Sequence, residues 1–155
     1  MGADRNPSNT FAGVFDGGNH TISNLEINTS AARYVGLFGA TSGTIKNLYL
    51  NNFDITGKDW VGGLVGYAYP GPRITNVHIT DVTINTTHYG GGLVGWGYGQ
   101  YSNCSATNPT VTLVYDTSIP DNGDKAGGLI GFLGEDAVVQ NSAATNVNIT
   151  GVRDV

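Results

Sequence analysis

"DWVGGLVGYAY", residues 59–69, and "HYGGGLVGWGY", residues 88–98, are two nearly identical stretches that decide the fold. Both place glycines around two apolar residues, and aromatic residues flank both. The word Gly-Leu-x-Gly inside them occurs four times in the chain, beginning at Gly36, Gly63, Gly92 and Gly128. The steps between these glycines are 27, 29 and 36 residues. A period of this length indicates a repeat architecture.

A second word follows each glycine word: an apolar or aromatic residue, any residue, and then asparagine. The same word also occurs once ahead of the first glycine word, which gives five copies. After each asparagine, apolar and small residues alternate with other residues, and β-branched residues are common. Alternation with a period of two predicts strands, and no stretch keeps the 3.6-residue period of a helix.

The patterns predict an all-β chain, a parallel β-helix-like solenoid of about five coils of 27–29 residues. A single domain is expected at 11–155, with a lead-in coil at 11–35 and repeats at 36–62, 63–91, 92–127 and 128–155. Residues 1–10 are expected to be disordered or an artificial start of the chain. The third repeat is longer because a turn-rich loop is inserted at about 115–125.

Stacked coils lie ~4.8 Å apart, so each residue faces its own copy above and below. Glycine is expected where a corner bends sharply or two backbones pass closely. The predicted columns are a leucine column in the core and an asparagine ladder, namely Leu37, Leu64, Leu93 and Leu129, and Asn24, Asn47, Asn76, Asn103 and Asn141. The residues after the leucines are also apolar, so the sequence leaves open whether their side is covered or the strand bulges.

Composition narrows the function classes. Charged residues make up 12% of the chain, about half of the usual ~25%. The net charge is −5 with no Lys/Arg cluster, which argues against nucleic-acid binding, and no apolar run suggests membrane insertion. Cys104 is the single cysteine and is expected in the core. The first residues lack a signal-peptide pattern, and we interpret the chain as an extracellular or cell-surface fragment of a larger secreted protein.

The repeat words support a family resemblance. "YVGLFGATSGTIKNLYLNNFDITG", 34–57, and "WVGGLVGYAYPGPRITNVHITDVTI", 60–84, resemble the GLUG repeat of large secreted or surface-bound bacterial proteins. These proteins include adhesin-like proteins and the non-catalytic parts of IgA-peptidase-type enzymes. "FAGVFDGGNHTISNLEI", 11–27, is similar to the segment that often precedes such repeats. The resemblance covers about 11–150 and departs at Cys104, Ala106 and Pro109, which replace larger core residues. It implies a right-handed solenoid and carries over no catalytic residue.

Patterns for catalysis or metal binding are weak. Asp54 and Asp81 fall in non-equivalent columns, so no column is expected to pair two carboxylates, as polysaccharide cleavage would need. The three histidines show no metal-ligand spacing. We therefore predict no enzyme activity and no cofactor, and the alternative is weak calcium binding by Asp121 and Asp124 in an acidic loop.

Aromatic residues recur at equivalent positions beside the glycine words. The candidate ligand-binding residues among them are Tyr67, Tyr69, Trp96 and Tyr98. A row of exposed rings binds flat sugar faces or protein partners, whereas buried rings would shield the glycine-rich turns. The sequence leaves both interpretations open.

We interpret the chain as a non-enzymatic structural and adhesive repeat module of a bacterial cell-surface or secreted protein. The alternative is a carbohydrate-binding module that uses the edge row of aromatic residues. A second alternative is an ice-binding solenoid, because outward residues such as Thr83, Thr110 and Thr112 build an imperfect threonine array. The expected partner is a host or environmental glycan or a surface protein, and exposed coil ends predict head-to-tail self-association.

Overall fold

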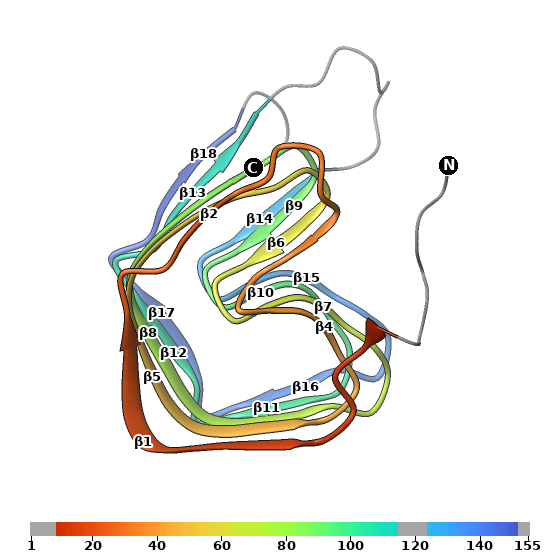
Figure 1. The fold of residues 1–155 in the computed structure, drawn as a ribbon. Coiled ribbons are helices and arrows are strands. Elements are labelled where there is room, and N and C mark those ends of the chain that lie inside the picture. The colour runs from red at the N-terminus through yellow and green to blue at the C-terminus, as the bar shows by residue number, and fades with distance from the viewer. Residues whose placement is uncertain (1–8, 115–123, 152–155) are drawn as a thin grey trace.

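The chain folds into a parallel β-solenoid, seen along its axis in Figure 1. The computed structural model describes residues 9–114 and 124–151, and these contain no α-helix. The inserted loop predicted at about 115–125 lies mostly outside the described residues, as do residues 1–8 of the predicted N-terminal segment.

One sheet of ten strands forms the outer walls, and two four-stranded sheets form the inner part (Figure 1). The outer sheet consists of β1 (Val14–Ser23), β2 (Glu26–Asn28), β5 (Thr44–Thr56), β8 (Arg73–Thr86), β11 (Gln100–Ser102), β12 (Ser105–Thr107), β13 (Thr110–Leu113), β16 (Val138–Gln140), β17 (Ala143–Thr145) and β18 (Asn148–Thr150). The first inner sheet consists of β3 (Tyr34–Val35), β6 (Trp60–Gly62), β9 (Tyr89–Gly91) and β14 (Lys125–Gly127). The second inner sheet consists of β4 (Phe38–Thr41), β7 (Val65–Ala68), β10 (Val94–Gly97) and β15 (Ile130–Leu133).

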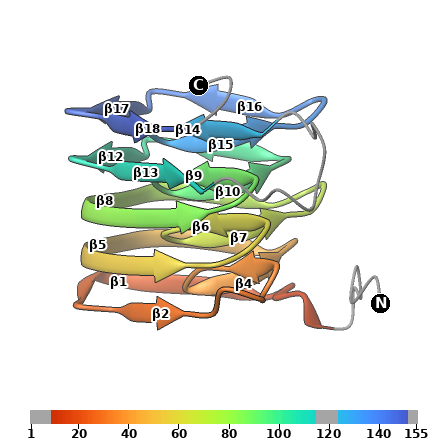
Figure 2. The ribbon, with the colours of Figure 1, turned by 90° about the horizontal axis from the view of Figure 1, so that it is seen from above.

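Each winding contributes one strand to each inner sheet, and Figure 2 shows the levels stacked side-on. The chain completes four windings and begins a fifth with β16, β17 and β18, so there are slightly fewer full coils than the five predicted. The sequence pattern counted the last repeat, 128–155, as a full coil. Gly128 instead lies inside the fourth winding, between β14 and β15, so only part of a fifth winding follows it.

The core follows from the alternation within the long strands. Two of its columns are Leu50, Ile79 and Ala106, and Ile55, Ile84 and Val111, all of them buried. The small side chain of Cys104 stands in register with that of Val77, and both are buried. The buried ring of Tyr101 occupies the column position of Ile74, and its hydroxyl donates to the carbonyl of Tyr98 at 2.8 Å.

The leucine column is present, and its two middle members, Leu64 and Leu93, are fully buried. Its end members, Leu37 and Leu129, are only partly buried because fewer windings cover them. Val65 and Val94 are also fully buried, so the opposite side of this bend is covered as well.

The two inner sheets meet at the glycine words, where the chain bends, and together they form what we call the wedge (Figure 1). A Cβ placed on Gly63 would stand 2.5 Å from the carbonyl oxygen of Gly92 in the next winding. The φ of Gly63 does not lie in the left-handed region. The repeated glycine is therefore needed because two backbones approach closely, as the sequence pattern predicted.

Asparagine and aspartate occupy every described non-glycine position with positive φ, and most of these residues form two ladders. In the first ladder, the Nδ2 of Asn76 donates to Asn47 at 3.0 Å, and the Nδ2 of Asn103 donates to Asn76 at 3.0 Å. Asn141 follows in register, one position after the Ser102–Gln140 pair. Only asparagine and aspartate, besides glycine, adopt this backbone conformation readily.

The placement of Asn24 in the first ladder was wrong. The pairing of Ser23 with Asn51 places Asn24 against Asn52, which donates its Nδ2 to Asn24 at 2.8 Å. A second ladder therefore exists, made of Asn24, Asn52, Asp81, Asn108 and Asn146. The sequence pattern misassigned Asn24 because β1 carries an irregularity between Asp16 and His20. That irregularity places Asp16 and Asn19 at the start of the first ladder, where they accept hydrogen bonds from Asn47 and Asn76.

Candidate functional site

Two columns of aromatic rings fill the wedge. On the first inner sheet, Trp60 is stacked between Tyr34 and Tyr89, with ring centroids 4.9 and 6.4 Å apart. On the second inner sheet, Tyr67 is stacked on Trp96 at 6.0 Å. The rings are in register because β6 pairs with β3 and β9, and β7 pairs with β10.

The two columns interlock across the wedge. Trp60 meets Tyr67 edge to face at 5.6 Å, and Tyr89 meets Trp96 edge to face at 4.8 Å. Aromatic pairs in such arrangements add about 0.5–1.5 kcal/mol each beyond the area they bury. The indole Nε1 atoms of Trp60 and Trp96 are buried and have no hydrogen-bond partner among the described residues. This arrangement favours a packing role, in which the rings shield the glycine-rich bends, for the centre of the wedge.

Burial in the wedge changes the acidity of its tyrosines. Desolvation, together with the neighbouring Tyr98, raises the pKa of Tyr67 to about 12. Burial also raises the pKa of Tyr89, and the nearby Asp124 and Asp59 add to this effect. Both phenols are therefore neutral hydrogen-bonding groups at physiological pH.

The four aromatic residues predicted to bind ligand separate into two groups. Tyr67 and Trp96 belong to the packed columns, and Tyr69 lies edge to face against Tyr67 at 4.7 Å. Tyr98 lies at the rim, where a Cβ on Gly134 would overlap the Tyr98 ring. Of the four, Tyr98 alone lines a described cleft.

The cleft beside Tyr98, which we call the corner cleft, has a volume of about 480 Å³. It is formed by the turns at 70–73, 98–100 and 135–136, which belong to three successive windings. A second cleft of about 360 Å³ adjoins it and shares Arg73 and Gln100. Sequence reasoning missed the polar residues here, although the Pro-Gly-Pro turn at 70–72 and the following repeat corners are visible signals.

A charged column stands beside the first inner sheet. Arg33 contacts Asp59 through a 2.9 Å ion pair, and the Nδ1 of His88 lies 3.0 Å from the other carboxylate oxygen of Asp59. Asp59 and His88 are both buried. Asp124, one of the two residues suggested for calcium, continues this column beyond His88, as shown by the Tyr89–Lys125 pair. Asp121, the other, lies outside the described residues.

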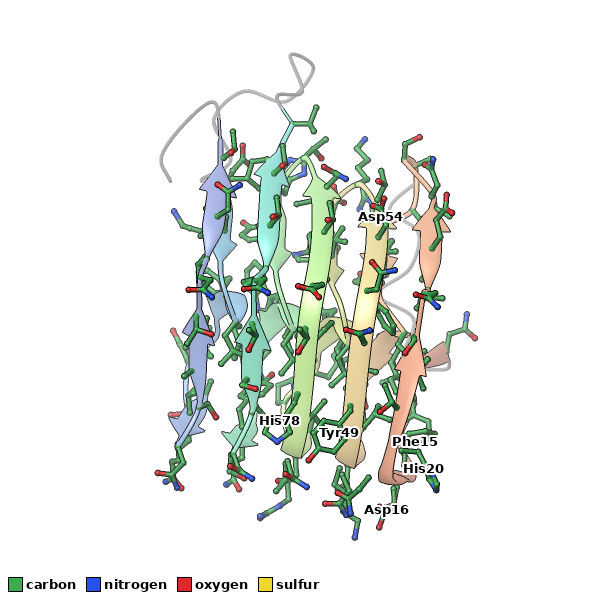
Figure 3. The ribbon with its side chains drawn as sticks, turned by 90° about the vertical axis from the view of Figure 1, so that its left-hand side faces the viewer. Phe15, Asp16, His20, Tyr49, Asp54 and His78 are labelled. Carbon is green, nitrogen blue, oxygen red and sulfur yellow. The ribbon has the colours of Figure 1, made fainter. Side chains whose placement is uncertain are left out.

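A hydrogen-bonded set on the outer wall was also missed from the sequence (Figure 3). The Nδ1 of His78 lies 2.8 Å from the hydroxyl of Ser105, and its Nε2 lies 3.1 Å from the Oδ1 of Asn76. Tyr49 stacks on the His78 ring at 5.2 Å. Ser105 lies in β12, between β8 and β17, so its backbone belongs to the sheet and forms no oxyanion hole. We interpret the set as surface cross-strand bonding.

The expectation that no column pairs two carboxylates was wrong. Glu26 stands beside Asp54 in register on the outer wall, where Figure 3 shows Asp54. Both residues are exposed, and like charges on adjacent strands are destabilising. The same column continues with Thr83, Thr110 and Asn148, so the outward threonine array is interrupted at both ends.

Among the residues at 9–114 and 124–151, no group of three or more His, Cys, Asp or Glu residues is close enough to hold a metal ion. The same residues contain no helix of the length and apolar character that spanning a membrane requires.

Comparison with known proteins finds relatives among large proteins. The immunoglobulin A1 protease of Streptococcus sanguinis is 35% identical over 135 residues, which are 86% of this chain and 7% of that protein. Halomucin of Haloquadratum walsbyi (strain DSM 16790 / HBSQ001) is 43% identical over 67 residues, which are 42% of this chain and 1% of that protein. No family model matches the chain, and no solved structure matches it. The chain therefore resembles a small segment of each relative, which is consistent with a GLUG-like repeat.

Proposed function

We propose that the chain is a non-enzymatic structural and adhesive module of a bacterial cell-surface or secreted protein, built from GLUG-type repeats. The observation that carries this proposal is the in-register stacking of equivalent residues on successive windings. Leucines, wedge rings and ladder asparagines each continue from one level to the next. Such a column structure makes a stiff spacer that holds surface loops in a fixed order along its axis.

An extracellular position is supported by the relatives. One has a name that denotes a mucin, and the other acts, by its name, on an antibody that is itself extracellular. Both are far longer than the matched segment, so we infer that the module occupies one part of a larger protein. We assign no proteolytic role to it, because the carboxylates paired in register, Glu26 and Asp54, are exposed on a flat wall.

Adhesion can be tested with beads that carry the purified chain. Under flow, we expect coated beads to stay on layers of mucin or epithelial cells longer than beads coated with a Gly63→Ile variant, in which the stack cannot close. Incubation with mucin or immunoglobulin A1 should release no fragments. Equal retention of both bead types would contradict the proposal, and so would cleavage that a single substitution in the chain abolishes.

Carbohydrate binding is the second candidate function, and the corner cleft favours it. The cleft brings an aromatic ring, Tyr98, together with polar side chains in a volume typical of small-ligand sites. The ring columns inside the wedge are less suited to sugars, because edge-to-face neighbours cover them. Ice binding receives less support, because Asp54 and Asn148 interrupt the threonine column. A glycan array comparing the wild type with Trp96→Ala and Tyr98→Ala separates the wedge from the cleft.

A further inference from the structure

The corner cleft has a rigid frame. The backbone N–H of Gln100 donates to the backbone carbonyl of Pro72 at 2.9 Å, and the backbone N–H of Val138 donates to the backbone carbonyl of Gly99 at 2.9 Å. Gly99 has a φ of +90°, and a Cβ there would stand 2.6 Å from the Pro72 ring. These contacts fix the three turns relative to one another, so a ligand would meet a preformed surface and little ordering cost.

Tyr98 is held in place at the wall of this cleft. One side of its ring rests on Gly134 of the following winding, and its hydroxyl interacts with that of Tyr67. Its ring also lies 6.4 Å from that of Trp96. A ring supported from behind in this way offers a flat apolar platform at low entropic cost.

Polar side chains without partners surround the platform. Within the described residues, Arg73, Gln100, Glu135 and Asp136 make no side-chain hydrogen bond or ion pair, and all four are exposed. Their amide, carboxylate and guanidinium groups are planar and carry two neighbouring donor or acceptor atoms. Such groups match the spacing of adjacent hydroxyls on a sugar ring, while an apolar sugar face fits an aromatic platform.

We propose that the corner cleft is the ligand site of this module, and that it binds a pyranose of a neutral or amino-bearing oligosaccharide with its apolar face against Tyr98. The inference rests on the adhesive function proposed above and names its ligand. Glu135 and Asp136 outnumber Arg73, and the chain carries a net charge of −5, so acidic sugars are disfavoured. The adjoining cleft, which is lined by the hydrogen-bonded hydroxyls of Thr75 and Ser102, receives a second sugar unit.

The test is a glycan array of neutral, amino-bearing and acidic oligosaccharides, followed by NMR titration of the whole chain with the sugars that bind. We expect a dissociation constant of about 0.1–1 mM for a neutral or amino-bearing trisaccharide, the affinity of a small contact area. The corresponding monosaccharide should bind about tenfold more weakly, which is 1.4 kcal/mol. Amide signals of residues 98–100 and 135–136 should shift.

Variants locate the site. Tyr98→Ala, and Gln100→Ala combined with Glu135→Ala, should each weaken binding about tenfold or more. The matched control is Tyr49→Ala, which removes an exposed tyrosine from the outer wall and should leave affinity unchanged. The Gln100 and Glu135 side chains are exposed, so their variants fold normally, and circular dichroism confirms this for Tyr98→Ala.

Four results would overturn the proposal: unchanged affinity in both cleft variants, loss of affinity in the Tyr49 control, binding confined to acidic glycans, or displacement of the sugar by a peptide alone. Bead retention distinguishes failure of the cleft assignment from failure of the proposed adhesive function. If the cleft variants still hold beads to the surface layers, the cleft assignment is wrong and the adhesive role stands. If the wild type binds sugar but holds no beads, the cleft assignment stands and the adhesive role is wrong.

Discussion

Single residues determine how far each amide ladder extends. An asparagine inside a ladder can donate its Nδ2 to the residue one winding earlier and offer its Oδ1 to the residue one winding later, as Asn76 does between Asn47 and Asn103. An aspartate at such a position accepts a hydrogen bond but has no amide to donate. The first ladder starts at Asp16, where hydrogen bonds from Asn47, Gly18 and Lys46 lower the pKa of the carboxyl group.

Asp81 interrupts the second ladder. It accepts from the Nδ2 of Asn108 at 2.8 Å but as a carboxylate has no proton for the Oδ1 of Asn52. We predict that Asp81→Asn raises the unfolding free energy by about 0.5–1 kcal/mol, the value of one net hydrogen bond. Chemical denaturation at pH 7 measures this change in the unfolding free energy. Asp136→Asn, at a positive-φ position outside both ladders, is the control and should change little. Equal stability of the Asp81 variant and the wild type would contradict the ladder argument.

Cys104 supplies a prediction about reactivity. Its side chain is buried, as the sequence analysis predicted, and burial raises the pKa of its thiol. The thiolate is the reactive species, so both effects slow modification in the folded state. A thiol-reactive disulfide reagent at pH 8 should label the native chain far more slowly than the chain in 6 M guanidinium, a denaturing concentration. Labelling at equal rates in both conditions would show that the third repeat opens freely.

At the scale of elements, the glycine words decide whether consecutive windings close. We predict that Gly63→Ala lowers the unfolding free energy by about 1–3 kcal/mol, because the added methyl group forces two backbones apart. Gly13→Ala is the matched control, since a Cβ there would stand 3.4 Å from the Phe11 ring and meet no backbone. Thermal or chemical unfolding of the two variants checks the difference. A Gly63 variant as stable as the Gly13 variant would show that the bend can relax.

Buried tyrosines of the wedge and of the core make the unfolding free energy depend on pH in the alkaline range. The pKa of Tyr67 is raised to about 12 from 10.0, and those of Tyr89 and Tyr101 are also raised, mainly by burial. Because the folded state holds these protons more tightly, the unfolded state loses them first as pH rises above about 10. The unfolding free energy should therefore be lower at pH 11 than at pH 8.

Guanidinium denaturation at the two pH values measures this loss, and phenolate absorbance follows the ionisation. Tyr67→Phe is the control, because it removes one of the groups responsible. Its stability should fall less between pH 8 and pH 11 than that of the wild type. If all eight tyrosines of the folded chain ionised together near pH 10, the ring packing described for the wedge would be wrong.

At the scale of the whole molecule, the repeat period was enough to predict the solenoid and the leucine column. The wedge could not be predicted, because the neighbouring residues Leu64 and Val65 are both apolar and both buried. The alternation of apolar and polar residues therefore does not show which side of the strand faces the core. Asn24 was misassigned because an irregular β1 shifts the register that the pattern assumes. The corner cleft was missed because its side chains come from turns of three windings, and turns carry no periodic signal.

The two ends of the stack differ in a way that predicts self-association. At the first level, Phe11 and Phe15 pack on Phe38, with ring centroids 5.1 and 5.4 Å away. At the last described level, Val139 and Val147 lie in β16 and just before β18, and they are 37% and 41% exposed. The polarity of the second ladder favours head-to-tail contact, because Asn146 at its end leaves an Oδ1 acceptor and Asn24 at its start leaves an Nδ2 donor.

We therefore expect the chain to associate end to end as its concentration rises, because the last level of the described residues leaves apolar side chains and strand edges exposed. Sedimentation velocity over a range of concentrations measures this association. Val139→Lys combined with Val147→Lys should shift the equilibrium toward the monomer, since the lysines bury poorly and repel one another. Thr145→Lys adds charge to the outer wall at the same level and should leave association nearly unchanged. If the double variant and the control sediment alike, contacts other than the open end hold the chains together.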